Sequence, residues 1–184
     1  MTKKMCIAAL FALLVVLSGC GKMVDSYMDF TIAQFDEFLS ASDDEIGNYL
    51  TSGKLDFAKT GDVFFVPFIK ETTHEECTLF IYTYWTGSQN DINITEISLV
   101  SQNDTTIFTS DYAASDIIIM RQEDALSEGV IEIGSFLKSE EWFSNGNKLY
   151  LSFSVSVSTE HGTISKDYTY EVALHQTKNF LFPT

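Results

Sequence analysis

Residues 148–158 read KLYLSFSVSVS, and this stretch decides the fold class. Apolar side chains occupy every second position from Leu149 to Val157, while Tyr150 and a series of serines fill the positions between them. Successive side chains of a β-strand point to opposite faces of the sheet. The alternation therefore predicts an antiparallel strand with one face in a core and the other face in water.

A second alternating stretch, Ile164–Leu174, follows closely along the chain. Glu160-His161-Gly162 separates the two stretches and predicts a short hairpin turn, in which the glycine can adopt a positive φ. The predicted inward face of this last strand carries four large side chains: Tyr168, Tyr170, Val172 and Leu174. The two stretches together predict a β-hairpin.

Six more short strands are predicted upstream of this hairpin, from their apolar runs or alternation. Pro67 makes the first of them an edge strand or a bulged strand, because proline cannot donate a ladder hydrogen bond. The second is apolar on both faces, which is typical of a central strand. The six ranges are Val63–Ile69, Cys77–Thr86, Ile92–Val100, Thr105–Thr109, Asp116–Arg121 and Val130–Ile133.

Eight strands at a spacing of about ten residues predict an all-β, antiparallel sandwich over residues 57–184. We expect an immunoglobulin-like or similar arrangement. The resemblance to immunoglobulin domains is limited to Trp85 on the predicted central strand, since the paired cysteines are absent.

Residues 26–56 predict a small acidic helical element before the sandwich. Met28, Ile32, Phe35 and Leu39 recur at helical spacing, with Asp25 or Ser26 as the N-cap. Ser42-Asp43-Asp44-Glu45 then predicts a capping box that opens a second short helix, which ends before Gly53.

The charge of the chain is strongly negative. It contains 26 acidic and 11 basic residues, a formal charge of −15, which excludes a basic nucleic-acid binder. Five acids of the helical element are candidate contacts for a cationic partner, unless they form only a solvated helix surface. They are Asp36, Glu37, Asp43, Asp44 and Glu45.

Tyrosines supply the second set of candidate binding residues. Tyr82, Tyr84, Tyr168 and Tyr170, together with Tyr150, could form an exposed platform on a sheet face that stacks on sugar rings or binds a protein. The alternative is that these rings pack across strands or under the N-terminal helices.

No catalytic or metal-binding motif stands out. His74-Glu75-Glu76-Cys77 offers too few ligands for zinc, and glycine-rich phosphate loops and nucleophile elbows are absent. The repeated Ser-Gln-Asn-Asp at 88–91 and 101–104 fits turn chemistry better than calcium binding. We therefore expect neither enzymatic activity nor a cofactor.

The first twenty residues have the pattern of a targeting signal. Lys3 and Lys4 precede the uncharged run Cys6–Leu17, which is too short to span a bilayer but suits a secretory signal. Leu17-Ser18-Gly19-Cys20 resembles the lipobox of bacterial lipoproteins. The resemblance implies cleavage before Cys20, diacylglycerol on its sulfur and acylation of the new amino terminus.

This processing would remove residues 1–19 as a signal peptide and leave residues 20–25 as a lipidated tether. Loss of both signal-peptide lysines changes the formal charge to −17. Gly21 in place of an aspartate favours the outer membrane in a Gram-negative cell. Two or three acyl chains hold a protein stably on a membrane.

Three functions fit these features. We favour a membrane-anchored envelope lipoprotein with a non-enzymatic role in protein binding or assembly. An acidic inhibitor or immunity-type lipoprotein that neutralises a cationic toxin or lysozyme is the second hypothesis. A carbohydrate-binding module is the third.

Overall fold

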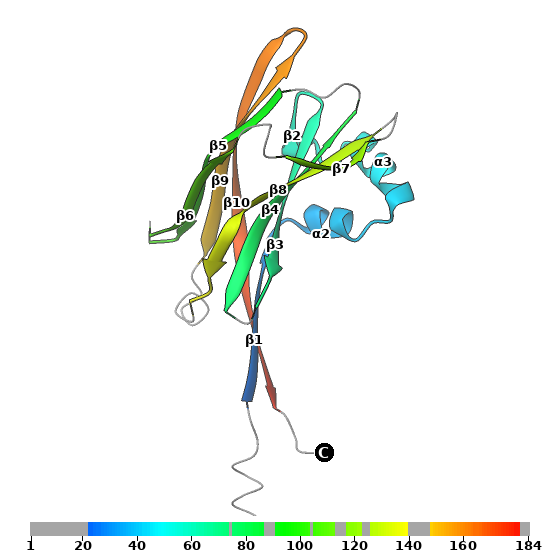
Figure 1. The fold of residues 1–184 in the computed structure, drawn as a ribbon. Helices are drawn as coiled ribbons and strands as arrows, with labels where there is room; N and C mark the ends of the chain where they lie inside the picture. The colour runs from blue at the N-terminus through cyan, green and yellow to red at the C-terminus, as the bar shows by residue number, and fades with distance from the viewer. Residues whose placement is uncertain are drawn as a thin grey trace, which may run out of the picture. The chain divides into compact units, whose positions relative to one another are not determined.

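The computed structural model describes residues 22–73, 75–86, 91–103, 105–112, 117–122, 126–139 and 148–180 (Figure 1). The chain divides into two compact units, of which the larger is Met28–Leu174. The described part of the other unit consists of the outer segments of the first and last strands, residues 22–27 and 175–180. The predicted signal peptide, the lipobox with Cys20, and His74 lie outside the described residues.

Two five-stranded antiparallel sheets form the described architecture. Sheet A has the order β1-β10-β9-β5-β6 and sheet B the order β2-β3-β4-β8-β7. Sheet A consists of β1 (Lys22–Phe30), β10 (Gly162–Phe180), β9 (Leu149–Thr159), β5 (Asp91–Ser101) and β6 (Thr106–Tyr112). Sheet B consists of β2 (Lys59–Thr60), β3 (Val63–Glu71), β4 (Glu76–Trp85), β8 (Ser127–Leu137) and β7 (Ile118–Gln122). The predicted all-β sandwich is confirmed.

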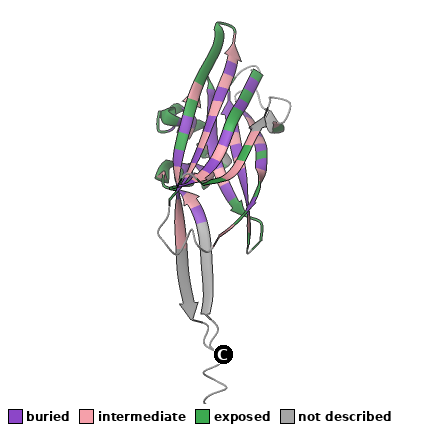
Figure 2. Ribbon diagram, turned by 90° about the vertical axis from the view of Figure 1, so that its left-hand side faces the viewer, coloured by how far each residue is buried: buried purple, intermediate pink, exposed green. Residues whose placement is uncertain are grey.

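Strand β9 shows how the alternating sequence forms the core. Leu149, Leu151, Phe153, Val155 and Val157 are buried, whereas the residues between them are partly exposed. Figure 2 shows such alternation of buried and more exposed positions along strands on this side of the molecule. The predicted hairpin is also confirmed, because Gly162 pairs with Thr159 and has a φ of 120°.

The predictions for β3 and β4 are confirmed as well. Strand β4 lies between β3 and β8, as expected for a strand that is apolar on both faces. Strand β2 pairs only with Val63 and Phe64 of β3, so the segment around Pro67 lies at the edge of the sheet. The missing N–H of proline therefore costs no ladder hydrogen bond on that side.

The prediction of one helix from Met28 to Leu39 is wrong. Residues 22–30 form β1 next to β10, and the helix α2 covers only Ala33–Leu39, with Ile32 as its N-cap. Met28 and Phe30 are buried two positions apart, the spacing of a strand. A distant partner strand thus overrides the local helical spacing.

The second predicted helix is present, with the predicted capping box at its start. Helix α3 (Asp43–Thr51) begins with the predicted capping box, in which the Ser42 N–H donates to the Glu45 carboxylate at 3.0 Å. Gly53 follows the helix with a φ of 78°. A 3₁₀ turn, η1 (Asp56–Ala58), then leads into β2. None of the described helices is long and apolar enough to cross a membrane.

The strand order differs from that of immunoglobulin domains. There the first strand pairs with the second and the last strand lies in the opposite sheet. Here the first strand, β1, and the last strand, β10, are neighbours in sheet A. Helices α2 and α3 lie beside sheet B (Figure 1), and α2 contacts both sheets: Phe38 meets Tyr84 of sheet B, and Phe35 meets Tyr170 of sheet A.

Candidate functional site

The outer face of sheet B carries apolar side chains on four neighbouring strands. Phe65 of β3 contacts Tyr168 of sheet A, with 6.1 Å between ring centroids, so the odd-numbered residues of β3 face the core. Their even-numbered neighbours face outward, and residues paired directly across strands share that face.

One register row on this outer face is apolar across four strands. Val66 pairs with Tyr82, Tyr82 with Val130, and Val130 with Ile118. We call these four residues the apolar row. Exposure rises along it from 0% at Val66, through partly buried Tyr82 and Val130, to 64% at Ile118.

The rows on either side combine aromatic rings with carboxylates. Tyr84 pairs with Glu128 in one row, and its hydroxyl donates to the Glu128 carboxylate at 3.2 Å. Phe80 pairs with Phe68 and with exposed Glu132 in the other row. Glu128 and Glu132 therefore flank Val130 on β8, and Arg121 of β7 pairs with Glu128, so the apolar row has a mainly acidic rim.

Helix α2 covers one end of this face through Phe38. The Phe38 ring meets Tyr84 at 5.0 Å and Tyr49 of α3 at 5.9 Å, both edge to face. Glu37 joins the two helices, because it accepts a hydrogen bond of 2.6 Å from the Tyr49 hydroxyl and lies 3.6 Å from the Lys54 ammonium. The hydrogen bond from Tyr49 is the main cause that lowers the pKa of Glu37, and the positive charge of Lys54 lowers it further.

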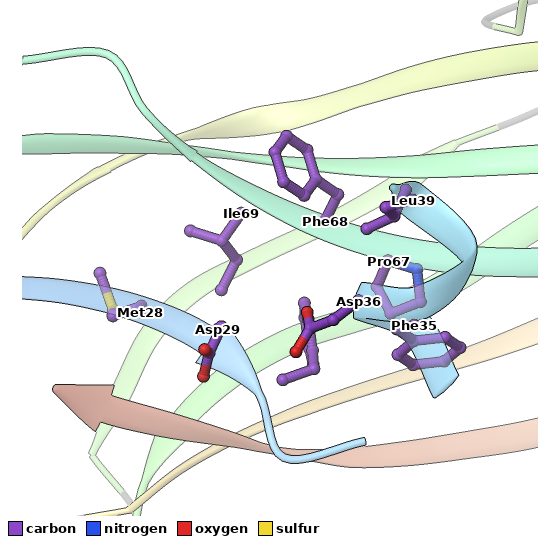
Figure 3. A pocket seen from close by; sticks show the side chains of 9 residues that line it. Met28, Asp29, Phe35, Asp36, Leu39, Pro67, Phe68 and Ile69 are labelled. Atoms are coloured by element: carbon purple, nitrogen blue, oxygen red, sulfur yellow. The ribbon is translucent and has the colours of Figure 1, made fainter. Parts of the chain in front are cut away.

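A small pocket opens between α2, the end of β1 and the edge of β3 (Figure 3). Its volume is about 50 Å³, far below the roughly 300 Å³ at which small-molecule sites begin. Apolar side chains form most of its wall, and Asp29 and Asp36 add two carboxylates. The lining residues are Met28, Asp29, Phe30, Phe35, Asp36, Leu39, Pro67, Phe68 and Ile69.

The predicted acidic contacts have different positions. Asp36 is exposed and lines the pocket, whereas Glu37 holds α2 against α3 and Glu45 caps α3. Asp43 and Asp44 lie in the first turn of α3, and their side chains are outside the described set. Helix structure thus accounts for two of the five predicted acids.

The predicted exposed tyrosine platform is wrong for three of its four main members. Tyr84, Tyr168 and Tyr170 are each at most 5% exposed. Tyr168 shares a hydrogen bond of 2.7 Å with Thr60, and the Tyr170 ring meets Phe35 of α2 at 5.2 Å. Tyr168 and Tyr170 lie in the core and Tyr84 lies under Phe38 of α2, because burial of a large ring stabilises the fold more than exposure of its one hydroxyl would. An exposed stack for sugar rings is therefore absent at these three residues.

Tyr82 is the tyrosine that stays at the candidate face. It is partly buried and stacks on Tyr84 at 6.4 Å between centroids. Sequence reasoning missed the other parts of the site: Phe68, Val130, Ile118 and Asp29. Ile118 and Val130 lie in apolar runs, which show that a strand is present but not which face is left uncovered.

The thiol of Cys77 is not a reactive group in the folded chain. Its side chain is fully buried, and burial raises its pKa to about 11. A thiol that stays protonated is a poor nucleophile and a poor metal ligand. The described residues contain no group of three or more metal-ligating side chains.

Comparison with known protein families, curated proteins and solved structures finds no match to this chain. The apolar row, its acidic rim and the pocket are therefore the features of this chain that bear on its function.

Proposed function

We propose that this protein is a lipid-anchored bacterial envelope protein with a non-enzymatic role in protein binding or assembly. The outer face of sheet B would be its binding surface. The observation that carries the proposal is the apolar row, which continues across four strands and ends with Ile118 at 64% exposure.

The composition of this face fits a protein interface. Interface cores are rich in aromatic and aliphatic side chains, and a polar rim surrounds them. Tyr82, Val130 and Ile118 would supply the core, and Glu128 and Glu132 the rim. Complete burial of a side chain such as Ile118 stabilises a complex by about 1.5–3 kcal/mol.

The proposed anchor is Cys20, on the strength of the lipobox resemblance. Acylation there would place the domain in the cell envelope, in the outer membrane if the cell is Gram-negative. The expected result is metabolic labelling of the wild-type chain by a palmitate analogue and no labelling of Cys20→Ala. Equal labelling of both chains would refute the anchor.

Site-specific photocrosslinking in cells tests the binding surface. A photoreactive residue at Ile118 should give a discrete crosslinked product. The matched control is Ile164, which is 45% exposed but lies on β10 of sheet A. Val130→Asp, combined with the probe at Ile118, should abolish the product if the apolar row is the contact. Equal crosslinking at both positions, or no effect of Val130→Asp, would refute the proposed surface.

A further inference from the structure

We infer that the partner inserts a lysine or arginine side chain into the pocket between α2, β1 and β3, next to the apolar row. This inference rests on the proposed function and adds the chemistry of the partner. Three features of the larger unit support it: the size of the pocket, the chemistry of its wall and its continuity with the row.

The size of the pocket suits one side chain. Its volume of about 50 Å³ has room for the end of a side chain but not for a drug-sized ligand or a cofactor. Met28, Leu39 and Phe68 supply an apolar wall from three different elements: β1, α2 and β3.

The charges in the pocket favour a cation. Asp29, at the end of β1, and Asp36, on α2, both line the pocket and bring two carboxylates to it (Figure 3). Lysine and arginine place an aliphatic stem along apolar surface and keep a charged head at the polar end. A wall of apolar side chains with carboxylates on one side matches both parts of such a side chain.

The outer face of sheet B beside the pocket also favours a positively charged partner. Glu128 and Glu132 flank Val130, and the whole chain has a formal charge of −15. Two basic residues belong to register rows of the same face: Lys70, one row beyond Phe68 on β3, and Arg121 of β7, which pairs with Glu128. Acidic residues still predominate, so the face would steer a basic partner and disfavour an acidic one.

Phe68 joins the pocket to the apolar row. It lines the pocket, and its ring meets Tyr82 of the row at 6.3 Å. A partner segment that covers Tyr82 with apolar side chains would therefore bring a neighbouring basic side chain to the pocket.

The test uses a small probe that isolates the pocket from the row. The ¹⁵N-labelled full-length chain, in zwitterionic detergent micelles, is titrated with N-α-acetyl-lysine methylamide and followed by NMR. The matched control is the same compound with its ε-amine acetylated. We expect saturable shifts at the amides of Asp29, Asp36 and Phe68 with the first probe only.

Charge variants locate the binding. Asp36→Asn should weaken binding about threefold, the scale of one partly exposed ion pair. The double variant Asp29→Asn/Asp36→Asn should abolish the saturable shifts, whereas Glu160→Gln, in the exposed turn between β9 and β10, should leave them unchanged. Thermal melts show whether each variant is folded. The comparison of the two probes on the wild-type chain needs no variant, so it tests recognition of the charge even if a variant fails to fold.

Four results would overturn the inference. Equal shifts with the acetylated probe would show that charge is not recognised. Shifts spread over the whole acidic surface would show that the pocket is not a site. Self-association of the chain that the double variant abolishes would make a second copy, not another protein, the source of the basic side chain. Crosslinking at Ile118 without lysine binding would refute this inference and leave the proposed function standing.

Discussion

Phe38→Ala tests the attachment of α2 to sheet B. The Phe38 side chain is 1% exposed, and its ring packs edge to face against Tyr84 of β4 and Tyr49 of α3. Truncation to alanine removes both contacts and leaves a cavity at the centre of this junction. The outer face of sheet B would then lose the element that covers one of its ends.

The expected cost follows from this burial. Replacement of a fully buried phenylalanine by alanine destabilises a protein by about 3–5 kcal/mol, because the transfer and cavity terms add. For a domain of this size each kcal/mol lowers the melting temperature by about 2–4 °C. We therefore expect a decrease of about 6–20 °C.

Urea and thermal unfolding, followed by circular dichroism, measure the change. Phe57→Ala is the matched control, since Phe57 contacts Phe35 at 5.4 Å but stays 38% exposed. Its loss should be about half as large, because the stabilisation scales with the buried area. A loss below about 1 kcal/mol for Phe38→Ala, or one no larger than that of the control, would show that α2 does not pack on sheet B as described.

Three further predictions concern stability and reactivity. First, burial raises the pKa of Cys77 from 9.0 to about 11 and that of Tyr168 from 10.0 to about 12. The folded chain thus keeps protons that the unfolded chain releases, so urea titrations should show full stability below pH 9 and a decline up to pH 12; a flat profile would contradict this. Second, in a Cys6→Ser/Cys20→Ser chain at pH 8, the Cys77 thiol should react with a disulfide reagent more than a hundredfold more slowly when folded than in urea; similar rates would show that it is accessible. Third, Gly134→Ala should cost about 2 kcal/mol or more, because a Cβ would lie 2.8 Å from the Phe108 ring at a φ of +147°. Gly162→Ala, with a φ of +120° and open space around it, should cost less; the reverse order in urea melts would refute the clash.

Local patterns predicted those parts of the molecule that depend on local chemistry. The alternation of Leu149–Val157, the capping box at Ser42 and the turn before Gly162 all appear in the structure. Each depends on residues close together in the chain. At these three places the local pattern and the tertiary fold agree.

Long-range pairing explains where those patterns failed. Met28 has helical spacing with Phe35, yet β10 offers a neighbouring strand, and the segment becomes β1. Backbone hydrogen bonds to a partner 140 residues away, such as that from Thr31 N–H to the Glu171 carbonyl at 3.1 Å, have no signature in the local sequence. The extent of the first helix was therefore not predictable from spacing alone.

The sequence by itself determined an acidic, all-β chain with two short helical segments and a lipobox-like start. Only the tertiary structure decided which apolar faces are covered. Tyr168 and Tyr170 belong to the core because sheet B and α2 lie over them, while Ile118 remains exposed at the end of its row. Periodicity shows that a strand has an apolar side; the packing of elements distant in sequence determines whether that side meets another layer or remains accessible to a partner.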